Sequence, residues 1–151
     1  MKKILLLIVL AISAVSVSAQ HTHAVGGDLN LSFGKGGVAF GVGAKYHHGF
    51  NDHWRATGDV KVLFAGYNAL NVDANINYLF EVGSNDLKVY PLAGIGIYNW
   101  FGSGSATRAT FNLGGGVDYP LTGNWYLNGE FKFRFYNAVR EELSVGIMYK
   151  F

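Results

Sequence analysis

The sequence contains no cysteine, only two prolines and few charged residues. The absence of cysteine excludes disulfides, a thiolate metal site, a cysteine nucleophile and a lipid-anchored N-terminal cysteine. Charged residues make up 15% of the chain, against about 25% in an ordinary soluble domain. The formal net charge of +2 is too small to indicate nucleic-acid binding.

Glycine and aromatic residues are abundant instead. The 151 residues include 21 Gly, 11 Phe, 9 Tyr and 3 Trp, and half of the chain is hydrophobic. The length fits a single domain. The apolar content is too close to average for a helical membrane protein. A chain rich in glycine and aromatics but poor in charge favours tightly curved β structure.

The first nineteen residues have the pattern of a secretory signal peptide. Lys2 and Lys3 precede an apolar run over residues 4–12, and small residues lead to Ala19. The run is shorter than the roughly 20 residues that a spanning helix needs. We therefore expect cleavage after Ala19 and a mature domain over residues 20–151. Cleavage removes two basic residues, which leaves ten of each sign and no net charge.

Eight segments of the mature domain alternate between apolar and polar residues, as expected for strands with one apolar face. These segments are residues 24–33, 38–47, 54–64, 70–80, 87–100, 108–119, 125–135 and 143–151. Pro91 and Leu92 obscure the alternation of the fifth, where we favour Val89, Ala93, Ile95 and Ile97 on the apolar face. In the other seven segments the apolar face carries no charge.

The polar face of these segments carries five acids and six bases. They are Asp28, Asp59, Asp73, Asp118 and Glu130, with Lys45, Arg55, Lys61, Lys132, Arg134 and Lys150. An unpaired buried charge costs several kcal/mol. If this face lines a narrow lumen, the charges must pair, and we expect Glu130, Lys132 and Arg134 to meet Asp118, Asp59 or their neighbours.

Two architectures fit such alternation, a soluble barrel or sandwich and a membrane barrel with its apolar face toward lipid. Segments of roughly 9–11 residues match tilted spanning strands. One group of aromatics lies at one end of the strands: Tyr46, Trp54, Tyr78, Tyr119, Trp125 and Tyr149. A second lies at the other end: Phe33, Phe64, Trp100, Phe111 and Phe135. Two such girdles are typical of membrane barrels. We therefore predict an all-β, eight-stranded antiparallel up-and-down transmembrane β-barrel, with a lipocalin-like soluble binder as the architectural alternative.

The C-terminal alternation of Leu143, Val145, Ile147, Tyr149 and Phe151, and the glycine-rich run over 112–119, resemble the small eight-stranded outer-membrane barrels of the OmpA/OmpX type. The resemblance extends over residues 20–151. It implies location in a bacterial outer membrane and contact with outer-membrane lipid. It also implies that Tyr149 and Phe151 act as the signal for the insertion machinery, with periplasmic chaperones as transient partners. We expect a monomer.

The five histidines lie at the end of the barrel that we assign to the periplasm. They are His21, His23, His47, His48 and His53. Their spacing matches no known ligand pattern, and no serine with an acid partner accompanies them. We therefore expect exposed turn histidines, no metal or other cofactor, no nucleic-acid partner and no enzymatic activity.

The surface loops are expected over 34–37, 65–69, 101–107 and 136–142, which is short for an adhesin. The expected function is a structural or porin-like outer-membrane protein with a salt-bridged lumen. The alternatives are a barrel that binds a small ligand or a surface partner and, third, a lipid-modifying enzyme.

Overall fold

The computed structural model describes residues 22–35, 37–64, 68–101 and 104–151. The predicted signal peptide, Gln20 and His21, and residues 36, 65–67 and 102–103 of the loops expected at 34–37, 65–69 and 101–107 lie outside these residues. Within them, no helix is long and apolar enough to cross a membrane.

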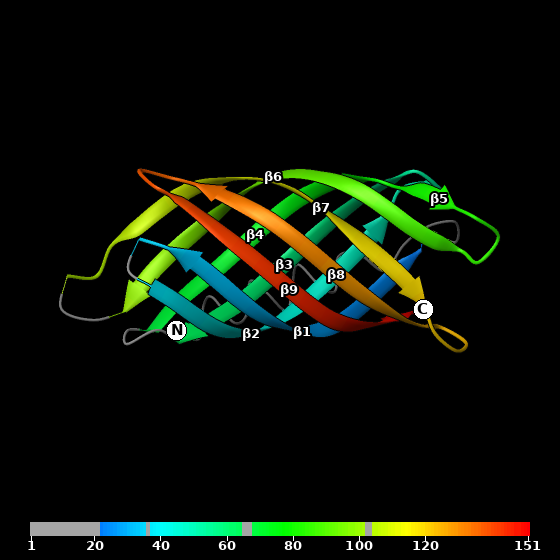
Figure 1. The fold of residues 1–151 in the computed structure, drawn as a ribbon, viewed down its shortest axis with the longest axis horizontal. Helices are drawn as coiled ribbons and strands as arrows, with labels where there is room; N and C mark the ends of the chain where they lie inside the picture. The colour runs from blue at the N-terminus through cyan, green and yellow to red at the C-terminus, as the bar shows by residue number, and fades with distance from the viewer. Residues whose placement is uncertain (1–21, 36, 65–67, 102–103) are drawn as a thin grey trace.

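The chain forms nine β segments in an antiparallel sheet (Figure 1). They are β1 (His23–Gly34), β2 (Gly37–Gly49), β3 (Trp54–Phe64), β4 (Asn68–Tyr78), β5 (Phe80–Val82), β6 (Leu87–Phe101), β7 (Thr107–Pro120), β8 (Trp125–Phe135) and β9 (Val139–Lys150). Consecutive segments pair with each other except β4 and β5, which both pair with β6, and β1 also pairs with β9. These pairings close the sheet into a barrel.

The barrel has eight strands, because β4 and β5 together form one strand that is interrupted at Leu79. Both segments pair with β6, and the interruption lies opposite Tyr90 and Pro91. Proline has no N–H to donate to a neighbouring strand. The predicted single strand over 70–80 is therefore correct in outline, and Pro91 accounts for its local break.

The predicted strands agree closely with the observed ones except at the last. The third and seventh segments match β3 and β8 exactly, and the facing predicted for Val89, Ala93, Ile95 and Ile97 is confirmed by their exposure. The last strand, however, begins at Val139 and not at residue 143. The loop predicted over 136–142 is wrong, because Arg140 and Glu142 continue the alternation of β9 and pair with β8.

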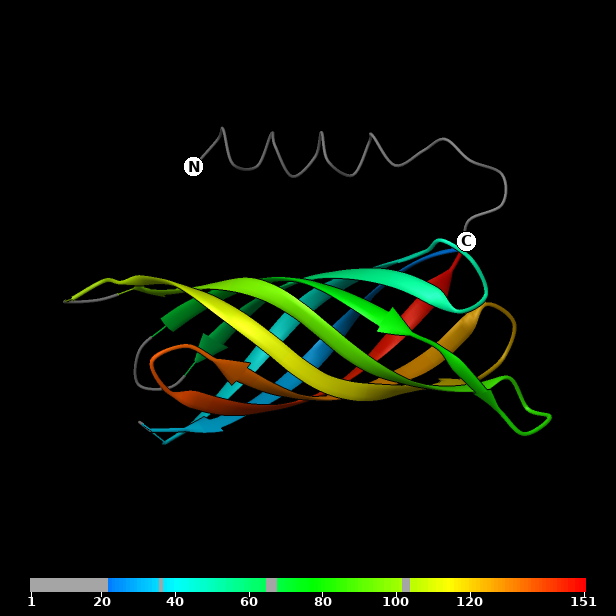
Figure 2. The same cartoon turned by 90° about the horizontal axis from the view of Figure 1, so that it is seen from above.

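Both ends of the described chain lie at one end of the barrel, which we call the terminal mouth (Figure 2). The backbone N–H of Phe151 donates to the carbonyl oxygen of His23 at 2.9 Å. The turns β2–β3, β5–β6 and β7–β8 lie at this end, and Gly123 takes a φ of 61° in the last of them. The connections β1–β2, β3–β4, β6–β7 and β8–β9 lie at the opposite end, the far rim.

The two faces of the barrel wall differ completely. Outward side chains are mostly apolar and exposed, as at Leu29 (57%) and Ile95 (67%). Inward side chains are mostly polar or charged and almost wholly buried. Soluble monomers rarely expose an apolar patch larger than a few hundred Å². A continuous apolar band around a closed barrel is instead the surface of a protein surrounded by lipid.

Candidate functional site

The lumen contains twelve buried charged side chains, six acids and six bases. They are Asp28, Asp59, Asp73, Asp118, Glu130 and Glu142, with Lys45, Arg55, Lys61, Lys132, Arg134 and Arg140. Ten of these were identified from the sequence. Arg140 and Glu142 were missed because they fell in a segment assigned to a loop. Together with Ser144 they occupy every second position, which already continues the polar face of the last strand.

The centre of the lumen is built around Glu142. Its carboxylate accepts from Lys61 Nζ at 2.6 Å and from Arg134 at 2.9 Å, and lies 3.5 Å from Lys132 Nζ. Lys61 also lies 3.3 Å from a carboxylate oxygen of Asp59. The residue missed from the sequence is thus the acid that joins three of the predicted bases.

Arg134 and Asp73 form the most specific pair of the network. Two guanidinium nitrogens donate to the two carboxylate oxygens of Asp73, each at 2.6 Å. Such a two-pronged pair fixes geometry as well as charge. Lys132 bridges Asp73 at 3.2 Å and Asp59 at 3.4 Å. The expected meeting of Lys132 with Asp59 occurs, whereas Arg134 pairs with Asp73 and not with Asp118.

A second group extends the network toward the terminal mouth. Lys45 Nζ donates to Glu130 at 2.7 Å and to Asn128 at 2.8 Å, and lies 3.5 Å from Asp28. The Tyr90 hydroxyl donates to Glu130 at 2.8 Å. Asp28 also lies 3.7 Å from Lys61, which connects this group to the centre. The side chains of these ion pairs have at most 1% of their surface exposed.

Glycines make room for the charged side chains. Gly43 stands opposite both Asp28 and Lys61, Gly96 opposite Asp73, and Gly114 opposite Lys132 in the strand register. A barrel of eight strands is only just wide enough to be filled by side chains. Glycines opposite Asp28, Lys61, Asp73 and Lys132 therefore leave room for salt bridges that cross the lumen.

Arg55 and Asp118 form an ion pair at the inner end of the terminal mouth. The Arg55 guanidinium also lies 4.5 Å from the centre of the Tyr90 ring, a distance typical of a cation–π contact. Asn128 donates to Asp118 at 2.6 Å and so ties this pair to the Lys45 group.

Lys150 does not belong to the buried network, contrary to the sequence prediction. It is exposed and lines the opening of the terminal mouth. Lys150 is the last residue of β9 and pairs with Ala24 near the first residue of β1. At the end of the wall its side chain reaches water, so it needs no buried partner.

An apolar cluster closes the lumen at the far rim. Leu63 and Tyr98 are each 1% exposed and pack with Ala39 and Ala69, and Trp100 packs against them. The prediction that Trp100 belongs to an outer girdle is wrong. Trp100 pairs with inward Ala69, and its ring stands edge-on to that of Tyr98 at 4.6 Å. A large aromatic here covers the charged centre from that end.

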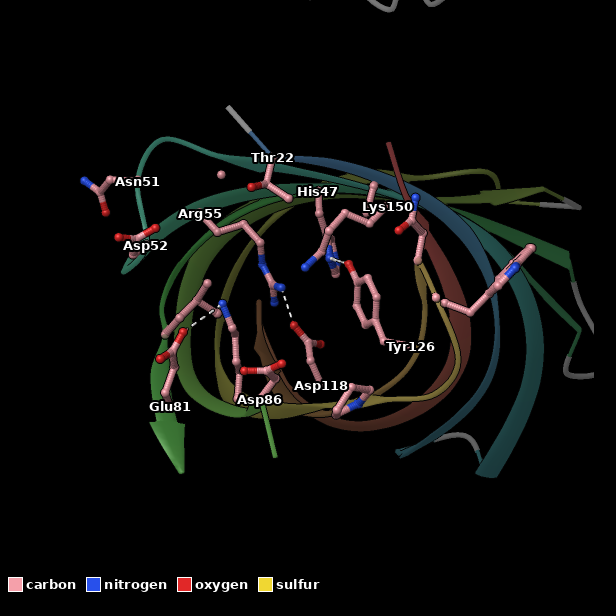
Figure 3. A pocket seen from close by; sticks show the side chains of 18 residues that line it. Thr22, His47, Asn51, Asp52, Arg55, Glu81, Asp86, Asp118, Tyr126 and Lys150 are labelled. Carbon is pink, nitrogen blue, oxygen red and sulfur yellow. Dashed lines mark hydrogen bonds and ion pairs between the residues drawn. The ribbon is translucent and has the colours of Figure 1, made fainter. Parts of the chain in front are cut away.

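The terminal mouth holds a cavity of about 350 Å³. Arg55, Asp118, His47 and Tyr126 point into the barrel there, and Lys150 lies beside Tyr126 (Figure 3). His47 is 2% exposed, and its Nδ1 lies 2.7 Å from the Tyr126 hydroxyl. The expectation of exposed turn histidines is therefore wrong for His47, because it continues the inward series Gly43, Lys45. It is correct for His53, which is exposed in the β2–β3 turn.

Asp59, Asp73 and Glu142 each have a carboxylate oxygen within 4.8 Å of the others, a grouping that could hold a metal ion. These carboxylates face Lys61, Lys132 and Arg134 at 2.6–3.5 Å. Ammonium and guanidinium groups thus already supply the positive charge that a cation would bring. This geometry fits a closed ionic network and not a metal site.

The residues predicted to form an aromatic girdle lie on the outer face at the terminal mouth. Trp54 contacts Tyr78, and Trp125 contacts Tyr149, each with ring centres 4.9 Å apart. Tyr46 and Tyr119 share the same face. Phe151, at the C-terminus, is 64% exposed. A role for Tyr149 and Phe151 in insertion stays a prediction.

Comparison with known proteins agrees with this architecture. The outer membrane protein beta-barrel domain family matches residues 4–151. A search of curated proteins found no significant match.

Among solved structures, the chain is similar to the N-terminal β-barrel domain of Pseudomonas aeruginosa OprF, with 14% identity, a TM-score of 0.72 and coverage of 87% of this chain and 98% of that one. It is also similar to Neisserial surface protein A, with 19% identity, a TM-score of 0.66 and coverage of 87% and 97%. It is similar as well to Ail, the attachment invasion locus protein of Yersinia pestis, with 15% identity, a TM-score of 0.63 and coverage of 89% of this chain and 100% of that one. At these identities the structures show a shared fold. The chain belongs to the outer membrane protein beta-barrel domain family and is a bacterial outer-membrane protein.

Proposed function

We propose that the protein is a structural, non-enzymatic outer-membrane barrel whose lumen is closed to solutes. The single observation that carries this proposal is the central ionic layer around Glu142. Lys61, Lys132 and Arg134 meet Asp59, Asp73 and Glu142 there, and every side chain in these pairs is at most 1% exposed. A continuous water path would expose some of these groups.

The closure has a second part at the far rim. The cluster of Leu63, Tyr98 and Trp100 lies between the ionic layer and that end. A hydrated solute would have to displace apolar side chains and then separate the buried ion pairs, among them the bidentate Arg134–Asp73 pair. The mouth cavity, in contrast, leads only as far as the Arg55–Asp118 pair (Figure 3). Both termini then face the periplasm, as the family resemblance implies.

Planar-bilayer recording tests the closed lumen. The refolded mature barrel should give no discrete conductance steps. A variant with Lys61→Ala and Glu142→Ala, combined with Tyr98→Ala and Trp100→Ala, should give steps. It removes the 2.6 Å ion pair from the centre and the two large aromatic side chains from the far rim. Lys88→Ala, which removes a half-buried lysine at the terminal mouth outside the central ionic layer, is the control and should stay silent. Regular conductance steps from the unaltered protein would overturn the proposal.

The mouth cavity supports a second candidate, the binding of a small polar ligand. Its volume of about 350 Å³ is within the range of small-molecule sites, about 300–1,000 Å³. Lys150, His47 and Asp118 offer donors and acceptors around it. Screening a library of small metabolites by thermal shift, with His47→Leu as the comparison, would detect such a ligand. Shifts that are identical in both proteins would argue against this cavity.

A further inference from the structure

Two histidines that lie 25 residues apart in the sequence meet on the outer face of the terminal mouth. His23, the first residue of β1, is the direct partner of His48, near the end of β2. Their Nδ1 atoms lie 3.3 Å apart, and their ring centres 4.9 Å. Both rings are half-buried at the edge of the wall.

A third polar atom faces the same point. The Tyr46 hydroxyl lies 2.7 Å from His23 Nδ1 and comes from the same strand and the same face as His48. His23 Nδ1 therefore has two polar neighbours, whereas a single ring nitrogen either donates one proton or presents one lone pair. The Tyr46 oxygen and the His48 nitrogen therefore meet at this one atom.

Aromatic neighbours hold the two imidazoles in place. Phe151 stacks on His23 with ring centres 5.8 Å apart, and Phe50 stands edge-on to His48 at 4.9 Å. The carbonyl oxygen of His23 accepts from the backbone N–H of Phe151. The rings are thus oriented by packing on both sides before any ligand arrives.

This arrangement matches the ligand geometry of a transition metal. Two imidazole nitrogens about 2.0–2.1 Å from a tetrahedral Zn²⁺ are separated by roughly 3.3 Å. We propose that His23 and His48 bind a divalent transition-metal ion such as Zn²⁺ or Ni²⁺ through Nδ1, with the Tyr46 oxygen as a neighbouring donor. In the sequence, the His21-Thr22-His23 and His47-His48 runs offer imidazole nitrogens for a metal, but their spacing matches no known ligand pattern. The strand register is what makes His23 and His48 direct partners.

A bound ion would link three segments of the barrel. β1 and β2 supply the ligands, and the C-terminal Phe151 packs on one of them. Because binding to the folded state alone stabilises it, the ion should raise the unfolding temperature.

Isothermal calorimetry with ZnCl₂ on the untagged mature barrel in detergent tests the proposal. We expect one ion per barrel and a rise in unfolding temperature with added Zn²⁺. His23→Gln and His48→Gln should each weaken binding by at least about tenfold, the scale on which even outer-shell groups change metal affinity. Tyr46→Phe should weaken it by less than either histidine variant.

The other histidines supply matched controls. His53→Gln, His47→Gln and His21→Gln should each keep the affinity of the unaltered protein. Heat-modifiable migration on gels confirms that every variant is folded before titration. Absence of Zn²⁺ binding by the unaltered barrel would overturn the proposal. So would binding that survives both His23→Gln and His48→Gln, or that is lost equally with His21→Gln.

Discussion

The outer and inner faces of the barrel use the same strands but are stabilised in different ways. The outer face is a band of separate apolar side chains, such as Val62 and Leu127, that need no individual partner because lipid surrounds them. The inner face is a set of charged groups in which each, as with Arg134 and Asp73, has a partner at a defined distance. The stability of the outer face therefore depends on its overall apolar composition, whereas that of the inner face depends on the identity of each residue.

The largest expected effect is the loss of one inner partner. Arg134→Leu leaves Asp73 and Glu142 without their shared guanidinium, and breaking a buried pair in this way costs about 3–5 kcal/mol. Urea unfolding of the barrel in lipid vesicles, followed by gel migration, measures the change. Arg134→Lys keeps the charge but loses the two-pronged contact. Its stability should lie between those of the unaltered protein and Arg134→Leu. Unchanged stability of Arg134→Leu would show that the inner face does not depend on individual partners.

A charge placed on the outer face should cost slightly less. Leu127→Arg or Val62→Arg puts an arginine toward lipid, at a cost of about 2–4 kcal/mol near the membrane centre. The yield of folded, heat-modifiable protein in vesicles measures this cost. Leu127→Ile is the control and should fold normally. Efficient folding of both arginine variants would contradict the lipid-facing assignment of this face.

Variants of the Arg55–Asp118 pair show whether stability depends on the two charges themselves or on each charge having a partner. Asp118→Leu alone leaves Arg55 without its carboxylate and should cost about 2 kcal/mol, within the range of about 1–3 kcal/mol for a buried donor left unsatisfied. Replacing both residues by leucine should recover most of that loss, since an apolar pair of similar volume is often neutral relative to an ion pair. The same unfolding assay applies. A double variant no more stable than Asp118→Leu would show that the pair has no such coupling.

The smallest effect is expected at the aromatic girdle. Trp125→Leu removes the ring contact with Tyr149 but keeps an apolar side chain toward lipid. The expected loss is about 1 kcal/mol, the size of a single aromatic pair contact. Trp54→Leu, which removes the equivalent contact with Tyr78, should give a similar loss in the same unfolding assay. A loss as large as that of Arg134→Leu would mean that the outer face also contains indispensable contacts.

Alternation predicted most of the wall because a strand places successive side chains on opposite faces. It failed at β9, where Glu141 interrupted the apolar series and made Val139, Arg140 and Glu142 look like loop residues. Glu141 is outward but lies close to the far rim, paired with Phe33 at the end of β1. The missed strand start removed from the prediction the acid that joins the central network.

The partners within the lumen could not be predicted from the sequence. Arg134 and Asp73 are 61 residues apart, and their meeting depends on the stagger that closes the barrel. The same holds for His23 and His48, and for Trp100, whose ring turns inward. Each of these contacts depends on the register between strands, which the pattern within a single strand does not specify.

The sequence by itself determined the strands, their two faces and the membrane location, because alternation and composition act locally along each strand. Only the tertiary structure decided which charges pair, that apolar side chains close the far rim, and that a cavity remains at the terminal mouth. These features join side chains across the lumen. Their distances are fixed only when the first and last strands meet and close the barrel.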